Sequence, residues 1–164
     1  MFLVDANVLI TAKNTYYPLE HIPQFWDWLI NKGSEGEIKM PREIYYEVAN
    51  YSDDLADWIK SEDTKESLLL EEDADPALVQ QALRFGYQSD DARFTDSELI
   101  KVGRDAFLVG YGLVGSSRTI VTKEVTKRTR RLGATRLPDA CDDCAVDWCD
   151  DFTMYRALDF NLRP

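Results

Sequence analysis

Four acidic residues stand where carboxylates could bind a divalent metal. Asp5 directly follows the apolar run Met1–Val4, and Glu47, Asp105 and Glu124 border or lie within later apolar stretches. Mg²⁺ and Mn²⁺ prefer oxygen ligands, and a protein usually supplies only a few carboxylates while water and phosphates complete the shell. Bound metal would relieve the mutual repulsion of the acids. We therefore predict one Mg²⁺ or Mn²⁺ site made by these carboxylates.

The segment Leu3–Ile10 carries the strongest signal. Asp5 and Asn7 interrupt a run that is otherwise wholly apolar, and polar groups in such a run need a partner, such as a metal with its ligand network. Taken singly, each acid has a common structural alternative, because acids at helix starts usually serve as N-caps or solvated loop residues.

The sequence gives little support for histidine catalysis, zinc binding or dinucleotide binding. His21 is the only histidine, which excludes a two-histidine ribonuclease mechanism and disfavours a Ser-His-Asp triad. Cys141, Cys144 and Cys149 lack a fourth zinc ligand, so partly buried thiols are expected. Gly110–Gly115 fits a dinucleotide fingerprint but follows a helix instead of opening one, so we interpret it as a flexible helix exit.

The elements that must position the acids are strands alternating with helices. Strands separated by helices predict an α/β fold with a mainly parallel sheet, in which ligands gather beyond the carboxyl ends of the strands. Asp5 and Glu124 fall at such ends. The predicted strands are Met1–Val4, Leu68–Leu70 and Thr119–Val121, and the main predicted helices contain Ile22–Ile30 (stopped by Gly33), Pro41–Asn50, a segment from Asp75-Pro76, and a segment from Asp105.

Length and composition predict one domain over residues 1–164. The N-terminus has neither the charged nor the apolar region of a signal peptide, and no apolar run approaches the roughly 20 residues of a membrane span. Three cysteines do not form a disulfide framework and suit a reducing compartment. We therefore expect a cytoplasmic protein with no membrane contact.

The opening segment Leu3–Ile10 resembles the first motif of PIN domains, which include the VapC-type toxin ribonucleases. Ala12–Pro18 and Phe25–Leu29 resemble an uncharacterised PIN-like branch in particular. Glu47 in Pro41–Val48 matches the second acidic motif, Asp105 in Arg104–Val109 the third, and Glu124 in Val121–Glu124 the last. For the third acid, Asp75 and Asp96 are alternatives, and spacing favours Asp105 because it lies 19 residues before Glu124, room for one helix and one strand.

The resemblance implies a PIN-like α/β/α sandwich and metal-dependent hydrolysis of RNA that leaves a 5′-phosphate and a 3′-hydroxyl. It implies Asp5 and Asp105 as principal metal ligands, with Glu47 and Glu124 binding directly or through water, and Asn7 and Thr122 orienting these carboxylates. It also makes the toxin of a toxin-antitoxin pair a plausible role, with an antitoxin protein as partner. A symmetric homodimer is the default assembly.

Charge is distributed unevenly along the chain. The net charge of −11 repels nucleic acid, but residues 118–136 carry seven basic residues and one acid, a local +6 that leaves −17 for the rest. This predicts a basic face for a polyanion or an acidic partner, with a solvated helix face as the alternative. The expected RNA-binding residues are Lys123, Lys127, Arg128, Arg130 and Arg131.

Two other functions fit the same sequence. A catalytically silent PIN-like module that binds RNA or protein would have the same fold, and convergence of the four carboxylates would separate it from an enzyme. A structure-specific DNA nuclease is the third hypothesis.

Overall fold

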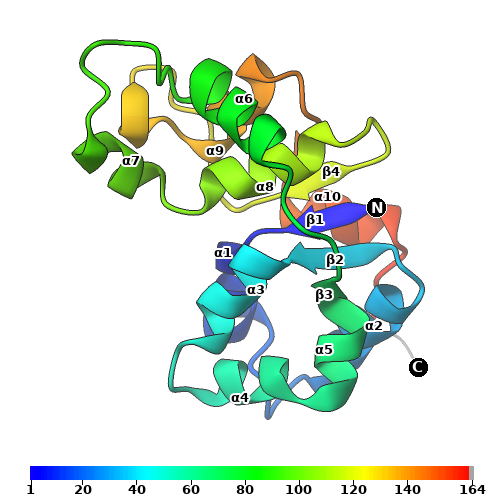
Figure 1. Ribbon diagram of the computed structural model, residues 1–164. Helices are drawn as coiled ribbons and strands as arrows, with labels where there is room; N and C mark the ends of the chain where they lie inside the picture. The colour runs from blue at the N-terminus through cyan, green and yellow to red at the C-terminus, as the bar shows by residue number, and fades with distance from the viewer. Residues whose placement is uncertain (163–164) are drawn as a thin grey trace. The chain divides into compact units, whose positions relative to one another are not determined.

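Five short strands form the central sheet in the computed structural model, which describes residues 1–162 (Figure 1). Their order across the sheet is β3-β2-β1-β4-β5, and β2 pairs in parallel with both β1 and β3. The strands are β1 (Phe2–Val4), β2 (Ile38–Pro41), β3 (Leu69–Leu70), β4 (Thr119–Val121) and β5 (Trp148–Cys149). The predicted α/β class with a short, mainly parallel sheet flanked by helices is confirmed.

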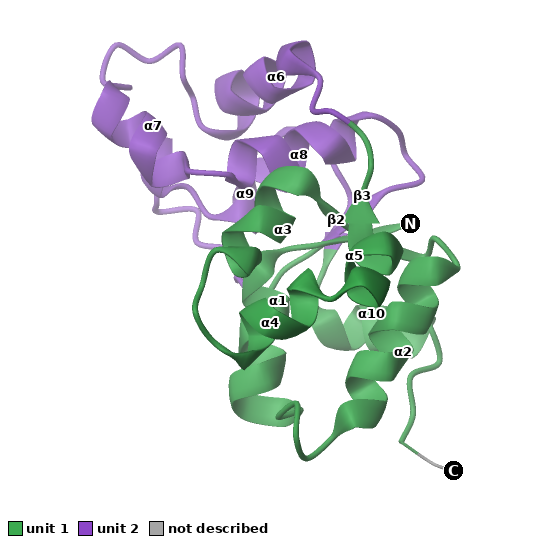
Figure 2. Ribbon diagram, turned by 60° about the horizontal axis from the view of Figure 1, so that its bottom comes forward, with its two compact units in different colours: residues 1–72, 121–123, 149–164 green, residues 73–120, 124–148 purple. Residues whose placement is uncertain are grey.

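Helices make up most of the remaining described chain. They are α1 (Ala6–Thr11), the π-helix η1 (Ala12–Tyr16), α2 (Pro23–Ser34), α3 (Arg42–Ala49), α4 (Asp54–Lys60), α5 (Glu62–Leu68), α6 (Pro76–Gly86), α7 (Asp96–Val102), α8 (Asp105–Leu113), the 3₁₀ turn η2 (Leu132–Ala134), α9 (Leu137–Asp143) and α10 (Asp151–Ala157). The chain divides into two compact units (Figure 2). Unit 1 comprises residues 1–72, 121–123 and the stretch from 149 on, and unit 2 comprises residues 73–120 and 124–148.

Unit 1 packs α2, α3 and α5 against its strands. The apolar stripe predicted for α2 is confirmed, because Phe25, Trp26 and Leu29 are all buried. Gly33 does not stop the helix, which continues to Ser34. A Cβ on Gly33 would come within 2.8 Å of the Ser67 carbonyl oxygen, so this glycine allows α2 to approach α5 closely.

Unit 2 is built from α6, α8 and α9, which pack on one another, with α7 against η2. The interpretation of Gly110–Gly115 as a flexible helix exit is wrong for its first half, because Gly110 and Gly112 are buried inside α8. A Cβ on Gly112 would lie 2.5 Å from Val146 Cγ1, and one on Gly110 would crowd the Val79 backbone. These glycines serve close packing.

The sequence missed two of the five described strands. β2 was overlooked because only Ile38 and Met40 alternate as buried apolar residues before Pro41. Pro41 was expected to begin a helix, whereas it ends β2 and precedes the first residue of α3. β5 is only two residues long, too short for hydrophobic periodicity to reveal it.

Candidate functional site

Asp5 follows β1 and is held inside unit 1. The residue is only 8% exposed. It occupies the N-cap position of α1, yet its carboxylate makes no capping hydrogen bond to that helix. Instead, the Thr122 hydroxyl donates a hydrogen bond to Asp5 Oδ2 at 2.8 Å. The common structural role of an acid at a helix start is therefore not the role of Asp5.

Asn7 completes a hydrogen-bonded chain that we call the Asp5 group, comprising Asp5, Asn7 and Thr122. Asn7 Nδ2 donates to Thr122 Oγ1 at 3.3 Å, and Asn7 Oδ1 accepts the Lys123 backbone N–H at 3.0 Å. Because the Thr122 hydroxyl accepts from Asn7, its hydrogen is directed toward Asp5. The structure thus brings together the carboxylate and the two residues expected to orient it.

Lys123 and Asp151 form an ion pair that sequence reasoning missed. Lys123 Nζ lies 2.9 Å from Asp151 Oδ1, and Asp151 is fully buried. Burial lowers the pKa of Lys123, but hydrogen bonding and attraction to Asp151 outweigh it and raise that pKa above its ordinary value. The ammonium also lies over the rings of Tyr16 and Phe152, at 5.2 and 5.3 Å from their centroids. Lys123 was expected to contact RNA, but its positive charge is already neutralised by Asp151 within unit 1.

A sequence signal for Asp151 did exist. Trp148 and Cys149 are a short apolar strand followed by two acids, the same order as β1 followed by Asp5. Asp150 is the N-cap of α10 and accepts the Thr153 N–H at 2.7 Å. Two adjacent acids before a helix are usually interpreted as an N-cap and a first-turn residue, so this pattern did not single out Asp151.

Glu47 also belongs to unit 1. It lies on α3, where Ile44 and Val48 are buried and Glu47 is half-buried. The expected amphipathic helix is confirmed, with Glu47 at the margin of its buried face. Unit 1 thus contains two of the four predicted metal ligands, Asp5 and Glu47.

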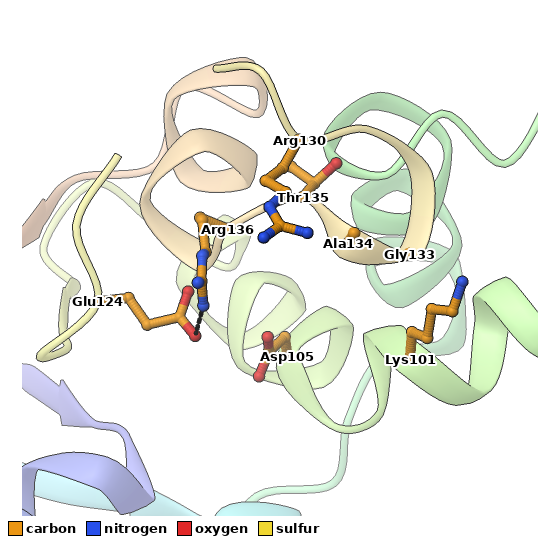
Figure 3. A pocket seen from close by; sticks show the side chains of 8 residues that line it. All are labelled: Lys101, Asp105, Glu124, Arg130, Gly133, Ala134, Thr135 and Arg136. Atoms are coloured by element: carbon orange, nitrogen blue, oxygen red, sulfur yellow. Dashed lines mark hydrogen bonds and ion pairs between the residues drawn. The ribbon is translucent and has the colours of Figure 1, made fainter. Parts of the chain in front are cut away.

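Asp105 and Glu124 line one pocket in unit 2, with a volume of about 300 Å³ (Figure 3). Asp105 is the first residue of α8, and its carboxylate is directed into the pocket. Three basic residues line the same space: Lys101, Arg130 and Arg136. We call this the acid–arginine pocket.

Glu124 is tied to the start of α9. Its Oε2 accepts the Leu137 backbone N–H at 3.0 Å, and its Oε1 lies 3.4 Å from Arg136 Nη1. Glu124 therefore has a structural role at the helix start in addition to its place in the pocket.

The two alternatives for the third acid lie elsewhere in unit 2. Asp75 is exposed and caps α6, because its Oδ1 accepts the Ala77 N–H at 2.8 Å. Asp96 is exposed in the first turn of α7. Neither lines the pocket that contains Asp105 and Glu124. Of the three candidates, only Asp105 shares that pocket with Glu124.

The basic segment contains residues with different surroundings. Arg128 forms ion pairs with Asp139, Asp142 and Asp143 at 3.2, 3.0 and 2.6 Å. These acids compensate its charge locally. Arg131 donates to the backbone carbonyls of Arg128 and Arg130, whereas Lys127 is exposed. The stretch is thus partly a solvated, self-paired surface.

Tyr87 is a second residue that the sequence did not reveal. It is fully buried in unit 2, and its hydroxyl has no hydrogen-bond partner among residues 1–162. Burial raises the pKa of Tyr87 well above its ordinary value, and the negative charges of Asp105 and Glu124 add to this effect. Tyr87 therefore remains a neutral phenol near both acids.

The described residues contain neither a preformed group of metal ligands nor a membrane-spanning helix. In residues 1–162, no group of three or more His, Cys, Asp and Glu side chains is arranged to hold a metal ion. Each unit contributes two of the four predicted acids. Within the same residues, no helix combines the length and the apolar character needed to cross a membrane.

Comparison with known proteins identifies a family for this chain. A family model described as a domain of unknown function, DUF4411, matches residues 2–162, nearly the whole chain. No curated protein and no solved structure matches the sequence.

Proposed function

The chain belongs to the DUF4411 family, a domain of unknown function, and from that premise we propose that it is a divalent-metal-dependent endoribonuclease. The resemblance of Leu3–Ile10 to the first PIN motif supports this assignment. Asp5 and Asp105 are the principal ligands of Mg²⁺ or Mn²⁺, and Glu47 and Glu124 bind it directly or through water. The α/β fold agrees with the PIN-like sandwich expected from the resemblance.

One observation carries the proposal. Asp5 is a buried carboxylate that does not cap its helix and is held by the Thr122 hydroxyl at 2.8 Å. A buried carboxylate needs hydrogen-bond donors, and Thr122 provides one from outside the helix. Hard oxygen donors of this kind are the ligands that Mg²⁺ and Mn²⁺ take.

The residues would divide the chemistry as follows. When bound, the metal lowers the pKa of water and neutralises charge on the phosphate. Thr122 and Asn7 fix the direction in which Asp5 presents its oxygens. Asp105 supplies a second carboxylate from the start of α8. A two-histidine acid-base mechanism is excluded, since His21 is the only histidine.

The biological setting is part of the same proposal. We infer a cytoplasmic toxin of a toxin-antitoxin pair, with RNA as substrate, an antitoxin protein as partner and a homodimer as the default assembly. Lys127, Arg130 and Arg131 remain the proposed RNA contacts. Arg128 and Lys123 contribute less, because carboxylates already compensate their charges.

A silent RNA- or protein-binding module is the second candidate. It is favoured by the contacts of Glu124, whose oxygens receive the Leu137 N–H and lie near Arg136. A carboxylate engaged in this way stabilises the fold whether or not metal binds.

Substitution of Asp105 separates the two candidates. Asp105→Asn keeps size and shape while removing one charge, so the variant should fold as well as the wild type in metal-free buffer. We expect Mn²⁺-dependent cleavage of RNA to fall at least about a hundredfold, or about 2.7 kcal/mol in barrier, as for removal of a catalytic electrostatic group. The matched controls are Asp75→Asn, at a helix cap, and Asp96→Asn, on an exposed turn. Both should retain wild-type cleavage.

Two outcomes would contradict the proposal. If Asp75→Asn is the inactive variant, the third acid has been assigned wrongly. If purified wild-type protein cleaves no RNA with any divalent metal, the silent module replaces the enzyme.

A further inference from the structure

Arg130 differs from the other arginines of the basic segment. Arg128 and Arg131 bind carboxylates or backbone carbonyls, whereas the Arg130 side chain makes no hydrogen bond or ion pair within residues 1–162. Figure 3 shows its guanidinium directed into the acid–arginine pocket, on the side facing Asp105. A guanidinium presents five N–H donors that cannot be deprotonated in proteins. This group is therefore ready to bind an anion.

Arg136 supplies a second guanidinium to the same pocket. Its only described acidic partner is Glu124, at 3.4 Å, which is long for a charge-assisted hydrogen bond of about 2.7–2.9 Å. Arg136 is also 43% exposed. A weak, partly solvated ion pair contributes little stability. Arg136 can therefore exchange Glu124 for a stronger anionic partner at small cost.

The pocket has the size and the hydrogen-bond donors for one phosphate group with part of its nucleotide. Its volume of about 300 Å³ is at the lower end of ligand pockets. Arg130 and Arg136 bring two guanidinium groups to its lining, whereas Lys101 is already paired with Glu98. Planar guanidinium groups match the oxygens of phosphate in paired hydrogen bonds.

We propose that Arg130 and Arg136 bind a phosphate group of RNA in the acid–arginine pocket. Arg130 makes the primary contact, and Arg136 turns from Glu124 to the bound phosphate. The identification of the ligand as RNA rests on the proposed function, whereas phosphate binding itself does not. The phosphate is either a terminal monoester or an internal diester of the chain.

Inorganic phosphate tests the pocket without metal or cleavage. Binding to the full-length protein is measured by calorimetry in metal-free buffer, for the wild type, Arg130→Gln and Arg84→Gln. Arg130→Gln should weaken phosphate binding at least about tenfold, because hydrogen bonds to charged groups are lost. Arg84→Gln is the matched control, since Arg84 lies in the same unit, is exposed and pairs with Asp90. It removes the same charge and should leave affinity within about twofold.

Two RNA probes identify the source of the phosphate. A short oligoribonucleotide is compared with a 5′-phosphate and with a 5′-hydroxyl. Tighter binding of the phosphorylated form, lost in Arg130→Gln, assigns a terminal phosphate. Equal binding of both forms, weakened alike by Arg130→Gln, assigns an internal one.

The proposal is overturned if wild type and Arg130→Gln bind phosphate equally, or if the wild type binds none. These outcomes are distinct from failure of the proposed function. A protein that binds phosphate through Arg130 but cleaves no RNA retains this pocket and loses the nuclease assignment. A protein that cleaves RNA while Arg130→Gln binds phosphate normally retains the nuclease assignment and loses the pocket.

Discussion

The Asp5 group and the acid–arginine pocket present carboxylates in opposite ways. Asp5 is 8% exposed and receives the Thr122 hydroxyl at 2.8 Å. In the pocket, Asp105 and Glu124 are half-buried, and the Arg136 guanidinium lies 3.4 Å from Glu124. One region fixes a single carboxylate by hydrogen bonds, whereas the other surrounds two carboxylates with cations.

The contrast indicates a division of labour. A site that must hold a metal in one geometry benefits from ligands locked by their neighbours. A site that must accept and release a polyanion benefits from weak, exposed ion pairs that exchange at little cost. We therefore assign metal positioning chiefly to the Asp5 group and phosphate handling chiefly to the acid–arginine pocket.

Removing the Thr122 hydroxyl should disrupt the Asp5 group without altering the acid–arginine pocket. Of the two predictions that follow from this comparison, it has the larger expected effect. Thr122→Val keeps the β-branched shape but removes the hydroxyl that donates to Asp5, so Mn²⁺-dependent cleavage should fall by about ten- to a hundredfold, as for other partners of metal ligands. Activity is measured over a Mn²⁺ titration. The loss should appear mainly as a higher Mn²⁺ requirement.

Thr119→Val, at the start of the strand that precedes Thr122, is the matched control, because it makes the same chemical change outside the Asp5 group. An equal loss of cleavage in both variants would show that a change to this part of the chain, and not the loss of the Thr122 hydroxyl bonded to Asp5, lowers activity.

Each unit contains a partly or fully buried thiol whose ionisation should affect stability to a smaller extent. Burial raises the pKa of Cys144, in unit 2, and of Cys149, in unit 1, from 9.0 to about 11 in each case. Because the folded pKa exceeds the unfolded value, each thiol contributes stability below pH 9, and that contribution is lost as pH rises toward about 11. Urea unfolding should therefore show stability declining over this range.

Cys144→Ser and Cys149→Ser should each flatten part of that decline. Similar contributions of the two thiols to the free energy of unfolding would show that both units bury side chains to a similar degree. The partial exposure of Asp105 and Glu124 would then be a local feature of their pocket. A pH profile unchanged by either substitution would contradict the assignment of these thiols.

The sequence was most informative where a polar residue interrupts an apolar run. Asp5 and Asn7 stood out because an apolar strand and helix must bury whatever lies between them. Asp75 could also be recognised as an N-cap from the following proline, and its hydrogen bond to Ala77 confirms that role. Signals of this kind depend on a few neighbouring residues.

The rest of the site depends on contacts between distant segments. Asp151 is separated from Lys123 by 28 residues, and no local pattern indicates their ion pair. Charge count alone also could not distinguish Arg130 from Arg128, which meets three carboxylates on α9. The basic segment was therefore predicted as one RNA-binding face, although its residues have separate surroundings.

The central claim is that Asp5 binds the divalent metal, and the melting temperature in Mn²⁺ tests it most directly. At a hundred times Kd, binding stabilises the folded protein by about 2.7 kcal/mol, which for a chain of this size raises the melting temperature by about 5–10 °C. We predict that Asp5→Asn loses most of this rise, whereas Asp75→Asn, which alters only a helix cap, keeps it. An equal Mn²⁺ response in wild type and Asp5→Asn would contradict the account.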